Sequence, residues 1–262
     1  MASAPQQPQL PLFFKDLLPL NSQEHRNYRT RNVDRAPWLA TAHAIPLTVD
    51  EFVQAQRHYP IVFSTGDNPL PLALMGLNEG VNTFVDKEGT LLEPVYVPAY
   101  IRRYPFLLAR LQPDATDLSL MFDPTSDAVG TFEEGERLFD DEGKKTEATD
   151  RVLEFCQQFE QSAQRTQAML AELMNADLLM DGEVAIKRDG DAAPFVYRGF
   201  KMVDQEKLRN LDDAKVADWH KSGLMMLIHA HLFSLDLMRT IFGRQVTQGT
   251  APQANAGAQQ TA

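Results

Sequence analysis

Hydrophobic and polar residues follow one another differently in the two halves of the chain. Short apolar and β-branched runs lie at 61–65, 70–77, 83–86, 95–97, 106–111 and 118–122, between segments rich in Gly, Pro, Asn and Asp, and predict strands. Residues 149–175 instead space their apolar side chains three to four apart, which predicts a long helix with one face in the core. The pattern predicts an α+β fold, in which a curved antiparallel sheet from the first half packs against long C-terminal helices.

Capping residues and turn residues delimit the remaining elements. Thr48 and Glu51 have the spacing of a capping box and predict a short helix that ends before Pro60. Asp204 and Asp212 are each followed by a helical segment. Residues 184–188 and 195–203 predict a hairpin around 189–191, and 224–242 is apolar on nearly every side, which predicts a helix buried in the centre of the fold.

Both ends of the chain differ in composition from the middle. Residues 1–9 and 247–262 are rich in Pro, Gln, Ala, Gly and Thr, and have too little apolar surface to offset the entropy of ordering. Residues 10–20 space apolar side chains near helical intervals, so we expect them to dock on the body or on a partner. We therefore divide the chain into a flexible N-terminal arm at 1–19, a single α+β domain at 20–245 and a disordered tail at 246–262.

Two segments resemble each other in sequence. Residues 84–90 and 138–144 share an apolar pair, then Asp, two polar residues and Gly, which predicts two similar hairpin turns. Neither has the alternating oxygen ligands of a calcium loop. Two similar turns alone do not establish a repeat architecture.

Composition excludes several classes of protein. The net charge of −11 disfavours nucleic acid as a partner. One cysteine, Cys156, allows no intrachain disulfide and no cysteine-based metal site, and its position on the apolar stripe of 149–175 predicts a core residue. No secretory signal and no membrane-spanning stretch is recognisable, so we expect a cytoplasmic protein that could act at the cell envelope.

Aromatic residues and arginines gather in the middle of the chain, at 96–106. Three tyrosines, two prolines and an arginine pair lie within these eleven residues. Such residues suit a binding surface, although a buried aromatic turn explains them equally well. If the segment is a strand, Arg102 and Arg103 point to opposite faces, and one of them joins Tyr100 and Tyr104 in holding a carboxylate.

The two histidines at 229 and 231 are the other candidates for a ligand site. His229 and His231 lie about 200° apart on a helix, so they cannot bind one metal ion together. A core histidine bonded to a carbonyl is the more ordinary role for either. Nucleophile-elbow, phosphate-loop and dinucleotide motifs are absent from the sequence, so we predict no cofactor, no metal and no identifiable catalytic residue.

Several segments form a recognisable set: 59–63, 73–77, 82–86 with Gly89, 96–100, 102–106, 138–140 with Gly143, Gly199 with 203–204, and 230–235. Together these segments resemble the bacterial SapC-like family, which is named for an association with surface-layer loci and is distinct from a peptide-transport permease of the same short name. The sequence departs from the family pattern after Gly89 and at Lys201, where an aromatic residue is expected. The resemblance implies no catalytic residue or cofactor.

Three functional hypotheses follow from these observations. The first is a non-catalytic accessory or binding protein, linked by the family resemblance to the cell surface or to uptake of peptides or glycans. Its partner would be a peptide, a carboxylate-bearing small molecule or another protein. The second is an enzyme, or an accessory to one, acting on peptides or aromatic side chains. The third is a structural subunit that forms homo-oligomers.

Overall fold

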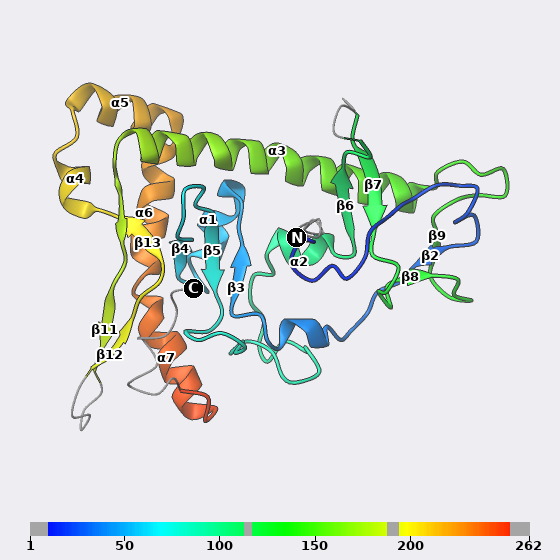
Figure 1. Cartoon of the computed structure of the whole chain (residues 1–262), viewed down its shortest axis with the longest axis horizontal. Helices are drawn as coiled ribbons and strands as arrows, with labels where there is room; N and C mark the ends of the chain where they lie inside the picture. The colour runs from blue at the N-terminus through cyan, green and yellow to red at the C-terminus, as the bar shows by residue number, and fades with distance from the viewer. Residues whose placement is uncertain (1–9, 113–116, 188–193, 252–262) are drawn as a thin grey trace, which may run out of the picture. The chain divides into compact units, whose positions relative to one another are not determined.

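Small antiparallel sheets and longer helices make up the part of the chain that the computed structural model describes, residues 10–112, 117–187 and 194–251 (Figure 1). This confirms the α+β class. The contacts divide the chain into two compact units that are interleaved in sequence. The first unit comprises Met1–Asp34 and Arg102–Glu160, and the second comprises Arg35–Ile101 and Gln161–Ala262. A single domain over 20–245 stays a prediction.

Two three-stranded sheets form the first unit. One has the order β1-β7-β6, and the other has the order β8-β2-β9. Their bounds are β1 Leu18–Pro19, β2 Arg29–Thr30, β6 Phe106–Ala109, β7 Ser119–Phe122, β8 Val129–Gly130 and β9 Glu136–Arg137. The helix α3 (Glu147–Asn175) begins in this unit and ends in the second. Its Cys156 packs in a buried cluster with Phe106, Phe122 and Leu138.

A five-stranded sheet and a separate hairpin form the second unit. The sheet has the order β10-β13-β4-β5-β3, and the hairpin pairs β11 with β12. The strands are β3 Ala44–Pro46, β4 Ile61–Phe63, β5 Pro71–Leu74, β10 Leu179–Asp181, β11 Val184–Ile186, β12 Phe195–Tyr197 and β13 Lys201–Val203. The helices, besides the end of α3, are η1 Pro37–Leu39, η2 Val49–Glu51, α1 Phe52–Ala55, α2 Ala99–Arg103 (which ends in the first unit), α4 Gln205–Arg209, α5 Asp213–Ser222, α6 Leu224–Ser234 and α7 Leu237–Thr247.

The same three-stranded arrangement occurs once in each unit. In the second unit β3 and β4 pair on either side of β5, and in the first unit β1 and β6 pair on either side of β7. The registers correspond position by position. Leu47 N donates to Pro71 O at 2.9 Å, and at the matching place Leu20 N donates to Leu120 O at 2.8 Å.

Tyr-Pro precedes the outer strand in both copies. The carbonyl of Pro60 accepts from Leu74 N at 2.9 Å, and the carbonyl of Pro105 accepts from Asp123 N at 3.0 Å. This correspondence pairs Tyr59 with Tyr104 and, two residues earlier, Arg57 with Arg102.

The two predicted turns close the two copies in the same way. Asp86 Oδ1 accepts from Glu88 N and Thr90 N, and Asp140 Oδ1 accepts from Glu142 N and Lys144 N, at 2.8–3.0 Å. Gly89 and Gly143 have φ of 77° and 78°, which glycine adopts without strain. The strands, Tyr-Pro and the turn together identify an internal repeat, one copy in each unit, which the turns alone could not establish.

The C-terminal helical segment differs from its prediction. Instead of one helix buried over 224–242, α6 and α7 are separated by a turn at 235–236, and α6 exposes Met226 and Phe233. By length and composition alone, Leu224–Thr247 could cross a membrane, with a mean hydropathy of 1.2. Its opposite face is in the core, where Ile228 and Met238 are buried. Burial in the fold therefore accounts for only part of this hydropathy, since 39% of the segment is buried.

The structure also differs from the prediction in several other elements. Residues 83–86 and 95–97 form no strand, and the predicted strand 195–203 is two strands separated by Gly199, which has φ of 90°. Two of the five strands of the large sheet, β10 and β13, come from the second half of the chain. Residues 10–20 dock in the first unit as predicted, but through β1 and the buried Phe14 rather than as a helix. Residues 1–9, 188–193 and 252–262, with most of both tails and the predicted 189–191 turn, lie outside the described residues.

Glu51 and Glu24 occupy corresponding positions in the two copies of the repeat, but we expect them to contribute unequally to the stability of the fold. Glu51 is buried and accepts from Thr48 N, Thr48 Oγ1, Tyr96 OH and Ala99 N, whereas Glu24 is exposed. Glu51→Gln places an amide donor among these donors, so the free energy of unfolding in urea should fall by about 1–3 kcal/mol. The matched variant Glu24→Gln should change it by less than about 0.5 kcal/mol. Equal effects of the two substitutions would contradict this assignment.

Candidate functional site

The central aromatic stretch is held by one buried carboxylate. Glu51 Oε1 accepts from Ala99 N at 2.6 Å and from Tyr96 OH at 3.1 Å, while Glu51 Oε2 accepts from Thr48 N at 2.8 Å. The Thr48–Glu51 spacing therefore forms the predicted capping interaction and also fixes the start of α2. The hydrogen bond between Ala99 and Glu51 joins residues 48 positions apart, so it could not be predicted from the local spacing of the sequence.

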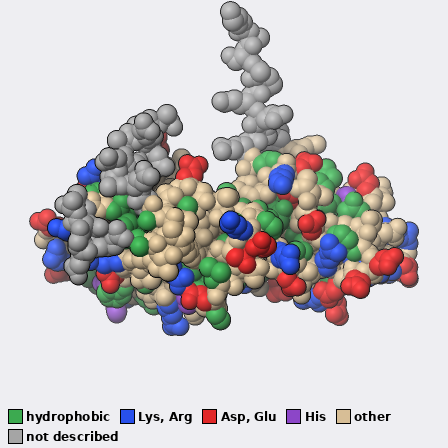
Figure 2. Space-filling view, turned by 90° about the horizontal axis from the view of Figure 1, so that it is seen from below, with side chains coloured by type: hydrophobic (Ala, Val, Ile, Leu, Met, Phe, Trp, Pro, Cys, Tyr) green, Lys and Arg blue, Asp and Glu red, His purple; other side chains and the backbone are tan. Residues whose placement is uncertain are grey.

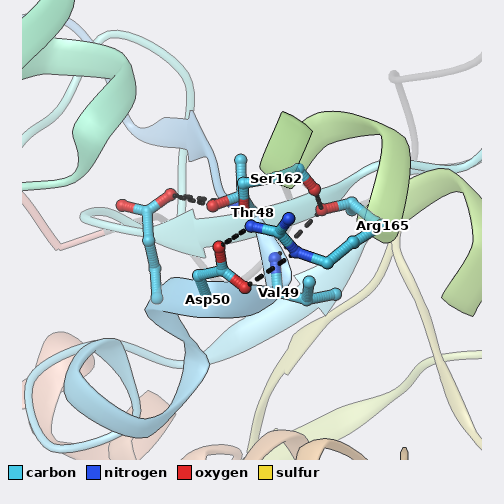
Figure 3. Close-up of polar contacts among 7 residues, drawn as sticks. Thr48, Val49, Asp50, Ser162 and Arg165 are labelled. Atoms are coloured by element: carbon cyan, nitrogen blue, oxygen red, sulfur yellow. Dashed lines mark hydrogen bonds and ion pairs between the residues drawn. The ribbon is translucent and has the colours of Figure 1, made fainter. Parts of the chain in front are cut away.

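The segment that carries Glu51 is fixed in turn by the part of α3 in the second unit (Figure 3). Arg165 forms a hydrogen-bonded ion pair with Asp50, and Val49 N donates to Thr166 Oγ1 at 3.0 Å. The hydrogen bond from Arg165 lowers the pKa of the Asp50 carboxyl. Both side chains of the pair are about half exposed, so solvent screens the pair and its contribution to stability is small. We interpret the cluster as a support for the Glu51 segment.

Arg102 and Arg103 lie on the helix α2, so the strand prediction for this pair is wrong. The helical propensity of arginine agrees with this outcome, and the anchored Ala99 starts the helix three residues earlier. Adjacent helical residues diverge by about 100°, so the two side chains still have different surroundings.

Arg103 is a buried structural residue of the first unit. Its side chain is 9% exposed, its guanidinium lies 4.2 Å from the centre of the Phe159 ring, and Nη1 is 3.7 Å from Glu160 Oε1. Arg102 is exposed, and its guanidinium lies 5.1 Å from the centre of the Phe155 ring. Of the pair, only Arg102 presents its charge to solvent.

The two tyrosines of the prediction are largely built into the fold. Tyr100, in the second unit, is 7% exposed. Tyr104, in the first unit, packs edge-on against Phe13 and Phe14, and its hydroxyl donates to Asp123 Oδ2 at 3.4 Å. Burial, followed by the neighbouring Asp123 charge, raises the pKa of Tyr104. Tyr104 is partly buried, whereas its repeat equivalent, Tyr59, is fully buried and donates to the backbone carbonyl of Tyr96.

The two histidines occupy opposite environments on α6. His231 is fully buried, with Nδ1 donating to Ile61 O at 2.7 Å and Nε2 accepting from Val203 N at 3.1 Å. Burial lowers the pKa of His231 to about 4. His229 is exposed, and its Nδ1 donates to Met225 O at 2.7 Å. The ordinary role, a core histidine bonded to a carbonyl, is therefore observed for His231.

The six predicted site residues do not gather in one place within either unit. In the first unit Arg102 contacts Phe155, Arg103 contacts Phe159, and Tyr104 contacts the 13–14 segment. In the second unit His231 is inside and His229 outside. Among the described residues, no three His, Cys, Asp or Glu side chains are grouped so that they could hold a metal ion.

A pocket of about 530 Å³ in the second unit is lined by none of these residues. Glu172, Lys215 and Trp219 are among the residues that line it. Trp219 Nε1 donates to Glu172 Oε2 at 3.2 Å, and Lys215 Nζ is 3.9 Å from the same carboxylate oxygen. These three side chains therefore contact one another at the edge of the pocket.

Several residues important to this geometry were not predicted from the sequence. Ser234 Oγ accepts from Ile61 N at 2.8 Å, and Gln245 Oε1 accepts from Leu77 N at 2.8 Å; both side chains are fully buried. A polar residue inside an apolar helix was the available signal for each. Nothing in the sequence marked Met226 and Phe233 as exposed.

A protein-family model, SapC, matches residues 20–241, which is most of the chain. Comparison with curated proteins and with solved structures gives no match to this chain.

The buried His231 predicts a specific dependence of stability on pH. Its folded pKa of about 4 lies below the ordinary 6.5, so the unfolded chain binds the proton more readily. This contribution is complete above pH 6.5 and is lost as the pH falls towards 4, by up to about 3 kcal/mol. In His231→Gln, which keeps one donor and one acceptor, unfolding measurements should show a shallower loss over this range. His229→Gln is the control and should retain the native slope; an unchanged slope in His231→Gln would refute the prediction.

Cys156 should react slowly in the native protein. It is 2% exposed, and burial raises the pKa of its thiol to about 11, so about one molecule in 10⁴ carries a thiolate at neutral pH. We expect a thiol reagent to label the chain slowly in buffer and rapidly in urea. An exposed cysteine introduced by Asp218→Cys should label rapidly in both. Rapid labelling of the native Cys156 would place it at the surface.

Proposed function

Because the chain belongs to the SapC family, we propose that it is a non-catalytic binding protein, acting as an accessory at the cell surface or in the uptake of peptides or glycans. The observation that carries the binding role is the contrast between two neighbouring arginines. Arg103 is used inside the fold, whereas Arg102 presents an exposed guanidinium against the Phe155 ring. A planar cation supported by an aromatic ring suits a carboxylate ligand.

The surroundings of the other reactive side chains support binding rather than catalysis. His231 has both ring nitrogens bonded to the backbone, and the Cys156 thiol is buried with a raised pKa. Glu51 is occupied by four donors. Nucleophile and base side chains need to reach a substrate, and these three serve the core.

The proposed partner is a peptide, a carboxylate-bearing small molecule or a protein with an exposed carboxylate. Nucleic acid is a poor candidate, since the net charge is −11. On the face seen in Figure 2, Lys and Arg side chains are interspersed with Asp and Glu. A cytoplasmic location close to the envelope is part of the same proposal.

Arginine-to-lysine variants test the assignment. Arg102→Lys keeps the charge but loses the planar fork, so we expect unchanged melting and about ten-fold weaker binding of short peptides with a free C-terminal carboxylate. Arg103→Lys should lower the free energy of unfolding by about 1–3 kcal/mol, because Arg103 is paired inside the unit. Calorimetric titration with such peptides and with their C-terminal amides measures the first effect, and thermal melts measure the second.

The repeat supplies a matched control in Arg57. Arg57 is exposed at the position that corresponds to Arg102, so Arg57→Lys should change neither binding nor melting. If peptide acids and amides bind equally, or if Arg102→Lys binds as tightly as the native chain, Arg102 is not the carboxylate site.

A further inference from the structure

The outward face of α6 is unusually apolar for an exposed surface. Phe233 and Met226 are 71% and 58% exposed, the two largest values among the large hydrophobic side chains of the described residues. They are seven residues apart and therefore lie on one side of the helix. His229 lies between them, with its ring centre 5.9 Å from that of Phe233. Exposed faces of this kind mark interaction surfaces.

The rotation of α6 cannot bring these side chains inside. On the opposite face His231 bonds Ile61 O and Val203 N, and Ser234 Oγ accepts from Ile61 N, all in buried surroundings. Turning the helix would leave these backbone groups unpaired at a cost of about 1–3 kcal/mol each. The apolar face is thus held outward by the core of the second unit.

We infer that this face is covered by the same face of a second copy of the chain, with the two α6 helices antiparallel about a two-fold axis beside His229. An isologous contact of this type uses one patch twice. In this register Met226 of each copy packs on Phe233 of the other, which forms two methionine–aromatic contacts. The inference does not depend on the carboxylate site at Arg102.

Charges at the two ends of α6 favour the antiparallel pairing. The exposed Lys221 precedes the helix. Asp236, with a side chain 91% exposed and Oδ1 3.9 Å from Arg239 Nε, follows the other end. The antiparallel arrangement brings Asp236 of each copy towards Lys221 of the other, whereas a parallel arrangement would bring like charges together.

A membrane surface fits the same face less well. The net charge of −11 opposes adsorption to anionic lipid. The outer side continues along α7 as the exposed Thr240, Gly243 and Thr247, so its apolar part ends with α6. A second copy requires only this short patch. Since a contact of two short helical faces lies at the small end of specific interfaces, we expect dissociation in the range of about 1–100 µM.

Sedimentation of the full chain over a concentration series tests the inference. We expect a monomer–dimer equilibrium, and Phe233→Ser should weaken it by about 30-fold or more, because the side chain is buried twice in a symmetric dimer. Leu111→Ser, at a side chain 56% exposed in the first unit, is the matched control and should leave the dissociation constant unchanged. Thermal melts of both variants verify that they fold.

Two further variants test the geometry. Asp236→Lys should weaken the dimer, and adding Lys221→Asp in the same chain should restore it. His229→Cys should give a disulfide-linked dimer under mild oxidation, whereas Thr240→Cys should not. The native chain should give no such dimer, because its Cys156 is buried.

Other results would overturn the inference. One such result is a chain that stays monomeric up to about ten times the upper limit of the expected range of dissociation constants. Another is a dimer whose dissociation constant is unchanged by Phe233→Ser. Loss of binding to neutral phosphatidylcholine vesicles in Phe233→Ser, with no dimer in solution, would assign the face to lipid. A dimer that forms only after removal of 252–262 would assign the face to that segment in the native chain.

Discussion

The fold of the second unit depends on a small set of buried hydrogen bonds between α6 and the sheet. Among the described residues, strands β13 and β4 pair at Lys201 and Phe63 alone, so their backbone groups farther along need other partners. His231 supplies them by donating to Ile61 O and accepting from Val203 N, and Ser234 accepts from Ile61 N. The imidazole can serve both strands only while it is neutral, which ties the integrity of the sheet to the lowered pKa of this ring.

The internal repeat explains why so many distinctive residues are architectural. The Tyr-Pro pair precedes the outer strand in both copies, and the Asp-to-Gly turns are built from the same backbone hydrogen bonds. Differences between the copies are therefore more informative than shared features. At the position of the apolar Leu74, the first unit has the buried Asp123, which accepts from Lys15 N at 2.7 Å and so anchors the N-terminal segment.

Local pattern predicted those parts of the fold that local physics determines. Spacing, caps and turn residues predicted the helix α3, the capped helices α4 and α5, the strands β4, β5, β6 and β7, and both Asp-to-Gly turns. The assignment of Arg102 and Arg103 to a strand failed because the start of α2 is set by Glu51, far away in the sequence. For the candidate site, the sequence identifies the arginine pair, but composition cannot distinguish the exposed Arg102 from its buried neighbour.

The helix α6 reverses the usual distribution of residue types. His231 and Ser234 are buried, while Phe233 and Met226 are exposed. An all-round apolar segment predicts a central helix because burial of large side chains normally stabilises it. Here the bonds of His231 and Ser234 to β4 and β13 decide the rotation, since an unpaired buried backbone group costs as much as a buried phenylalanine gains. The monomer therefore leaves apolar surface uncovered, and association through that surface is the process that would recover its burial energy.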